Sequence, residues 1–160
     1  MSEAAVPSAK AFTLSPSQGE CFTIIGGGVR ILADGASTGG ALVTFEAPIP
    51  PGEGPPLHRH EREDELFYVI EGRFKFVIDG TEFIAETGAF AYAGKGTAHS
   101  FRNIGTATGK LLVTCTPAGI EVPFRAIQDP APGSSRPPIT PADVVAALGA
   151  HGITFVGPPL

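Results

Sequence analysis

Short runs in which apolar and polar side chains alternate recur along the chain as far as Thr116, and Gly, Pro, Asn or Asp residues separate them. Alternation with a period of two is typical of a β-strand that buries one face. Strands are predicted at residues 11–14, 21–25, 29–32, 41–47, 65–70, 73–78, 81–85, 89–93, 98–103 and 110–116. Many short strands joined by tight turns predict an all-β domain, either a sandwich or a barrel.

The most regular of these runs, residues 73–85, predicts a hairpin. Asp79-Gly80 is a two-residue turn signal between two alternating segments. The cross-strand pairs that this turn predicts are Ile78 with Thr81, Phe76 with Phe83, and Phe74 with Ala85. The apolar face would continue from one strand to the next, so these phenylalanines are predicted to lie in the core.

The glycine triplet at residues 26–28 has two possible interpretations. Such a triplet can bind phosphate when it leads into a helix. The residues that follow, 29–32, have the composition of a strand. The triplet is therefore predicted to form a hairpin turn.

The composition changes after the last predicted strand. Residues 128–139 are rich in Pro, Gly and Ser, which is typical of a linker. A helix is predicted to follow, with Thr140 as its N-cap, Pro141 at its first position, Asp143 at its third and Gly149 as its stop. Its apolar stripe consists of Val144, Val145 and Leu148.

The length of 160 residues suits one domain. The expected organisation is a flexible leader at 1–10, a strand barrel at 11–127, the linker at 128–139, and a helix and tail at 140–160 that pack on the barrel.

Charge and targeting signals narrow the function classes. The formal net charge is −5 and no block of Lys or Arg occurs, so neither nucleic acid nor a membrane is an expected partner. Residues 1–10 lack the basic start and apolar run of a signal peptide, and a cytoplasmic location is expected. Cys21 and Cys115 form no spacing motif, so two reduced, structural thiols are predicted.

The segment 52–72 contains a candidate metal site. On an extended strand, His58 and His60 point to the same face, whereas Arg59 points to the other. Glu65 lies an odd number of positions beyond His60, so the polar run 61–64 must turn or bulge to bring the carboxylate to the same side. From Glu65 onward, alternate residues are apolar, which would place the carboxylate at the mouth of an apolar interior.

A second patterned segment, 88–103, supplies another histidine, His99, between Gly96 and Asn103. Together, segments 52–72 and 88–103 resemble the two conserved motifs of the cupin superfamily. The second segment departs from the family pattern at Gly94, where the family usually has proline. The resemblance implies a small antiparallel jelly-roll β-barrel with structural roles for Gly72 and Asn103.

The same resemblance implies one metal ion bound inside the barrel. The implied ligands are His58, His60, Glu65 and His99. Imidazole and carboxylate ligands without a thiolate suit a divalent transition metal, namely Fe, Mn, Ni, Co, Cu or Zn. Positions left open on the metal would permit chemistry. His151, which follows the helix stop, is expected to be solvent-exposed or helix-terminal rather than a ligand.

The resemblance to quercetinase-like single-domain cupins implies a small-molecule substrate and a metal-dependent dioxygenase that cleaves a flavonol or a related enolisable aromatic. Glu65 is the expected catalytic base, and Phe67 and Phe101 are expected to line the substrate wall, because each lies two positions beyond a predicted ligand. Arg59 and Arg62 could steer an anionic substrate, but strand alternation turns Arg59 outward, and neither is predicted to bind the substrate. The family resemblance also implies a homodimer.

Two alternatives remain open at this stage. One is a non-oxidative isomerase, decarboxylase or lyase acting on a small oxo-acid or sugar. That chemistry needs a further acid or base, for which the two tyrosines, Tyr68 and Tyr92, are candidates. The other alternative is a non-catalytic module in which the metal holds a small ligand.

Overall fold

The computed structural model describes residues 9–160, so most of the predicted leader at 1–10 lies outside the described residues. Strands predominate in the described part. They are β1 (Glu20–Ile24), β2 (Gly27–Ala33), β3 (Val43–Ile49), β4 (Pro56–His60), β5 (Asp64–Glu71), β6 (Arg73–Ile78), β7 (Thr81–Glu86), β8 (Phe90–Ala93), β9 (His99–Asn103), β10 (Gly109–Thr116) and β11 (Ile153–Pro159). The helices are α1 (Gly35–Thr38), α2 (Glu121–Ala126) and α3 (Pro141–Ala150).

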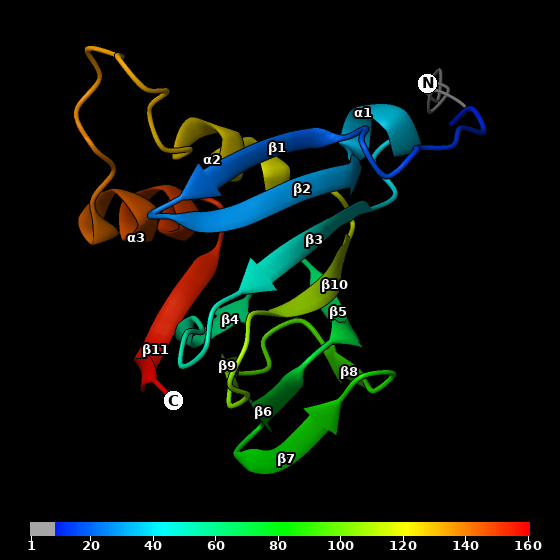
Figure 1. Ribbon diagram of the computed structural model, residues 1–160, viewed down its shortest axis with the longest axis vertical. Coiled ribbons are helices and arrows are strands. Elements are labelled where there is room, and N and C mark those ends of the chain that lie inside the picture. Colours follow the sequence, from blue (N-terminus) through cyan, green and yellow to red (C-terminus); the bar gives the residue numbers. More distant parts are fainter. Residues whose placement is uncertain (1–8) are drawn as a thin grey trace, which may run out of the picture.

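The strands form two antiparallel sheets (Figure 1). One sheet has the order β1-β2-β3-β10-β5-β8, and the other has the order β11-β4-β9-β6-β7. Aromatic rings join the two sheets across the interior, because Phe67 of β5 packs edge-on against Phe76 of β6 and Phe101 of β9, with centroids 5.3 and 5.7 Å away. The predicted all-β jelly-roll architecture is confirmed.

Both predicted hairpins are present. In the β6–β7 hairpin, Ile78 pairs with Thr81, Phe76 with Phe83, and Phe74 with Ala85, as predicted. The β1–β2 hairpin turns at Ile25 and Gly26, and Asp129 accepts hydrogen bonds from the backbone N–H groups of both residues. The glycine triplet therefore belongs to a hairpin, as expected.

The prediction of a strand at residues 11–14 is wrong. This segment has no regular secondary structure, and Phe12 and Leu14 line a groove with Leu32 of β2 and Thr44 of β3. The Arg30 side chain holds the next residues in place, because it donates hydrogen bonds to the carbonyl oxygens of Ser15 and Gln18. The segment thus contacts the surface of a sheet instead of pairing with its edge.

Three elements are absent from the sequence-based prediction: α1, α2 and β11. The strand β11 runs from the end of α3 along β4 (Figure 1). It pairs antiparallel with β4, with Ile153 opposite His60 and Phe155 opposite His58. The tail, which was expected to pack on the barrel, extends the sheet that carries both histidines.

The start of α3 follows the prediction, and its end does not. The Thr140 side chain accepts a hydrogen bond from the Asp143 backbone, and Pro141 opens the helix. The helix continues through Gly149 to Ala150, where it is capped by His151. The predicted apolar stripe is also partly wrong: Leu148 is buried, whereas Val145 is 52% exposed. Within residues 9–160, no helix has the length and apolar character needed to cross a bilayer.

Candidate metal centre

Neighbouring strands bring the three predicted histidines together. His58 and His60 of β4 are buried and the intervening Arg59 is exposed, as the alternation predicted. His99 of β9 lies directly opposite His58. The outward Arg59 forms an ion pair with Glu61. One face of the five-stranded sheet therefore presents three imidazoles to the interior.

Glu65 reaches the same point from the opposite sheet. Residues 61–63 leave the strand conformation before β5 begins, as the odd spacing required. Two backbone hydrogen bonds fix this connection: Glu61 donates to Gly152, and Gly96 donates to His60. Along β5, Glu65, Phe67 and Val69 are buried, whereas Tyr68 is exposed.

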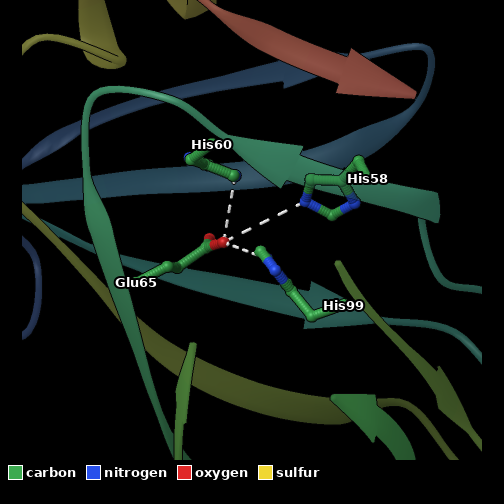
Figure 2. Close-up of side chains that lie close together, drawn as sticks. All are labelled: His58, His60, Glu65 and His99. Atoms are coloured by element: carbon green, nitrogen blue, oxygen red, sulfur yellow. Dashed lines mark hydrogen bonds and ion pairs between the residues drawn. The ribbon is translucent and has the colours of Figure 1, made fainter. Parts of the chain in front are cut away.

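The four side chains converge on one oxygen atom (Figure 2). Glu65 Oε2 lies 2.7 Å from His99 Nε2, 3.1 Å from His60 Nε2 and 4.0 Å from His58 Nε2. One potential ligand atom from each residue lies within 4.8 Å of all the others. We call His58, His60, Glu65 and His99 the His/Glu cluster.

Backbone carbonyls orient two of the rings. His58 Nδ1 lies 2.7 Å from the Pro56 carbonyl oxygen, and His99 Nδ1 lies 2.9 Å from the Thr97 carbonyl oxygen. A carbonyl oxygen can only accept a hydrogen bond, so each Nδ1 carries the proton. In the neutral ring, the Nε2 lone pair then points into the His/Glu cluster and is free to bind a cation.

His58 and His60 differ in how readily they bind a proton in the metal-free cluster. Burial lowers the pKa of His58 to about 4, although the charge of Glu65 opposes this shift. Burial acts in the same direction on His60, but the nearby carboxylates of Glu65 and Glu63 outweigh it and raise the pKa of His60 to about 10. The two shifts differ in sign because Glu65 lies nearer to His60 than to His58, and because Glu63 faces His60.

The carboxylate in this arrangement stays charged. Burial would raise the pKa of Glu65, but the charges and hydrogen bonds of His60 and His99 hold it well below its usual range. Three inward nitrogens and one buried carboxylate fit a single divalent transition metal ion, and no thiolate takes part in the cluster. The donor set does not distinguish Zn, Fe, Mn, Ni, Co or Cu.

The two predicted substrate residues lie at different distances from the cluster. Phe67 packs edge-on against His99, with ring centroids 5.8 Å apart. Phe101 packs against the Phe67 ring, with ring centroids 5.7 Å apart. Both are buried. The tyrosines considered as extra acids or bases, Tyr68 and Tyr92, are 45% and 51% exposed.

Two residues beside the cluster were not identified from the sequence. Glu63 is only 1% exposed, although it stands in a polar run that was interpreted as a turn. Its even spacing from Glu65 was a signal that both carboxylates could face inward. His151 has the predicted helix-terminal position and is outside the His/Glu cluster, but its side chain is largely buried against Glu63.

Comparison with known proteins identifies the domain. Residues 45–115 match the family described as a cupin domain. A quercetin 2,3-dioxygenase from Bacillus subtilis is 31% identical over 108 residues, which cover 68% of this chain and 32% of the relative. An oxalate-binding protein from Thermotoga maritima is 33% identical over 57 residues, which cover 36% of this chain and 47% of the relative. The chain spans between 32% and 58% of the length of the curated relatives it matches.

Solved structures agree on the fold. An RmlC-like cupin from Shewanella frigidimarina has a TM-score of 0.61 and 21% identity, covering 71% of this chain and 96% of that chain. KdgF from Halomonas sp. also has a TM-score of 0.61, with 18% identity over 71% of this chain and 99% of that chain. At these identities the likeness concerns the architecture alone.

Proposed function

The chain belongs to the cupin superfamily, and on this premise we propose that it is a metal-dependent dioxygenase that cleaves a flavonol or a related enolisable aromatic. The observation that carries the proposal is the His/Glu cluster, with three Nε2 atoms directed at one buried carboxylate beside an aromatic interior. The similarity to a quercetin 2,3-dioxygenase supports the same choice of substrate class.

Each residue of the cluster has a proposed task. His58, His60, Glu65 and His99 would hold the ion, which when bound would supply Lewis acidity toward the substrate hydroxyl and, for a redox-active metal, electron exchange with O2. Glu65 would accept the proton of that hydroxyl at its carboxylate, since it is the carboxylate at the centre of the cluster.

The surroundings would position the substrate and exclude water. Phe67 stands against His99 and would provide an apolar wall for a planar aromatic ring, with Phe101 behind it. An apolar wall at this point would keep the reacting groups together and reduce competition from water.

Oxygen uptake tests the proposal. Metal-free protein would be reloaded with Fe, Mn, Ni, Co, Cu or Zn one at a time and offered flavonols. We expect O2 consumption that matches flavonol loss with at least one metal, and its loss in Glu65→Gln. Glu61→Gln is the matched control, because Glu61 is exposed on the neighbouring turn. If neither flavonols nor small enolisable diketones support uptake with any of the metals, the dioxygenase proposal is wrong.

A binding module is the second candidate, supported by the similarity to an oxalate-binding protein. In that case the metal-loaded protein would retain a small carboxylate and release it chemically unchanged after exposure to oxygen. Mass spectrometry of the bound fraction distinguishes the two functions. A non-oxidative enzyme has less support, because Tyr68 and Tyr92 both face away from the interior.

The homodimer stays a prediction. Tyr68, Phe90 and Tyr92 are large exposed side chains on the adjacent strands β5 and β8, and they form the surface on which we place the proposed contact. Light scattering of the parent protein and of Phe90→Ser would test it. A monomeric parent protein would contradict the proposal.

A further inference from the structure

A second carboxylate, Glu63, lies between two histidines at the edge of the His/Glu cluster. Its Oε1 atom contacts Nε2 of His151, and its Oε2 atom lies 3.4 Å from Nδ1 of His60. The side chain of Glu63 is 1% exposed and that of His151 is 12% exposed. Through Glu63, the cluster is connected to His151, which lies 88 positions after Glu63 in the sequence.

His60 differs from the other two histidines in how its ring is held. Backbone carbonyls accept from Nδ1 of His58 and His99, but Nδ1 of His60 faces only Glu63. Within residues 9–160, neither Nδ1 of His60 nor Oε2 of Glu63 has a well-formed hydrogen bond to another group. Two buried polar atoms that face each other in this way are natural partners, and they need only a small movement to form a full hydrogen bond.

The backbone around His151 fixes its place. His151 caps α3. The carbonyl oxygen of Gly152 accepts a hydrogen bond from the backbone N–H of Glu61, and Ile153 pairs with His60 across the sheet. Gly119 leaves room for the ring, because a Cβ atom at that position would lie 3.1 Å from His151 Cε1. The backbone at residues 151–153 and the space beside Gly119 therefore keep the His151 side chain next to Glu63.

We propose that Glu63 and His151 are positioning residues of the metal centre. Glu63 would orient the His60 ring through Nδ1, and His151 would hold Glu63. The C-terminal segment 140–160, which lies outside the region matched to the cupin domain, would then tune the affinity of the site. Partners that orient a metal-binding histidine typically change metal affinity about 10- to 100-fold when they are removed. This inference rests on the metal-binding part of the proposed function.

Binding of Co²⁺ to the full chain tests the inference, with affinity measured by competition against a chelator and geometry followed by the visible absorption of the bound ion. Glu63→Gln should weaken binding about 10- to 100-fold. His151→Leu, which keeps the bulk and removes the donor, should weaken binding in the same direction. His151→Gln can place an amide N–H near the position of Nε2 and should restore most of the affinity. Val145→Ala, an exposed change on the same helix, should have no effect.

A double-variant cycle shows whether His151 affects metal binding through Glu63 or independently of it. If His151 acts through Glu63, the variant that carries both Glu63→Gln and His151→Leu should bind no more weakly than Glu63→Gln alone. The expected absorption change is also shared, because both variants free the same His60 ring. Additive losses would overturn the proposal.

The remaining outcomes separate this inference from the proposed function. If the parent protein binds Co²⁺ and His151→Leu binds it as tightly as Val145→Ala does, the positioning role is wrong and the metal site stands. If the parent protein does not bind Co²⁺, both fail. Should His151→Leu not fold, His151→Asn gives the same comparison, because Asn suits a helix terminus but is too short to reach Glu63.

Discussion

Cys115 lies directly opposite Glu65 on the neighbouring strand, and its side chain is completely buried. Burial and the nearby negative charge of Glu65 raise the pKa of Cys115 well above its usual value. A thiol in this state stays protonated, and the thiolate is the reactive form. The residue beside the cluster is therefore expected to be chemically inert in the folded protein.

The two cysteines should differ sharply toward a thiol reagent such as DTNB. Cys21 is exposed and should react at once, whereas Cys115 should react only after unfolding. Spectrophotometric titration should count one thiol in the native protein and two in denaturant. Cys21→Ser is the control and should leave no fast-reacting thiol. A fast reaction that persists in Cys21→Ser would contradict the burial of Cys115.

Metal binding should release a proton from His60. In the metal-free protein the pKa of His60 is raised to about 10, so the ring is charged at pH 8 and must lose its proton before Nε2 can bind a metal. His58, with a pKa of about 4, is already neutral at that pH. Isothermal titration calorimetry in two buffers of different ionisation enthalpy should detect the release. Binding without any proton release would show that His60 is neutral beforehand.

The same raised pKa makes a prediction about stability. A histidine whose pKa is higher in the folded protein than in the unfolded chain stabilises the fold below the unfolded value, and this contribution is lost as the pH rises through the folded value. For His60 this interval runs from 6.5 to about 10. Thermal unfolding of the metal-free protein should therefore show a falling midpoint over that interval. Metal-loaded protein is the control, because its His60 is already neutral and its midpoint should fall less.

The elements that the sequence predicted correctly are those specified by local signals. The β6–β7 register follows from Asp79-Gly80 and strict alternation, and the start of α3 follows from Thr140 and Pro141. The inward faces of β4 and β5 follow from the spacing of the ligands. Each of these features depends on residues only a few positions apart, so no knowledge of the tertiary structure is needed.

The elements that the prediction missed depend on contacts between distant residues. The strand β11 contains Gly157 and two prolines, which normally count against a strand, but it lies at the edge of its sheet, where an unpaired backbone position is tolerated. The burial of Glu63 depends on His151, which comes 88 residues later. The even spacing of Glu63 from Glu65 indicates only an inward direction, and no local pattern identifies His151 as its partner.

Asn103 should matter for stability. Its side chain is buried, donates hydrogen bonds to the Ile49 and Ala107 carbonyls, and accepts one from the Gly105 backbone. Asn103→Ala leaves those backbone groups without partners and should lower the free energy of unfolding by about 2 to 4 kcal/mol. Urea denaturation measures the loss. Thr106→Ala, at an exposed position of the same loop, should change the free energy of unfolding by less than about 0.5 kcal/mol.

Two glycines should respond in opposite ways to replacement by alanine. Gly54 precedes β4 in the segment that passes against β9, and a Cβ atom there would lie 1.8 Å from the Phe101 carbonyl oxygen. The obstacle is backbone, and the strand cannot move aside without disturbing the pairing of His58 with His99. Gly54→Ala should therefore lower the free energy of unfolding by at least about 3 kcal/mol and weaken metal binding as well.

Gly149 is the matched control for the same chemical change. It lies in α3, is exposed, and a Cβ atom there would meet nothing within 4 Å. Alanine loses less backbone entropy than glycine on entering a helix, so Gly149→Ala should raise the free energy of unfolding by about 0.5 to 1 kcal/mol. Denaturant unfolding of both variants, with Co²⁺ titration of each, gives the comparison. Equal effects of the two substitutions would show that the close approach at Gly54 does not limit the fold.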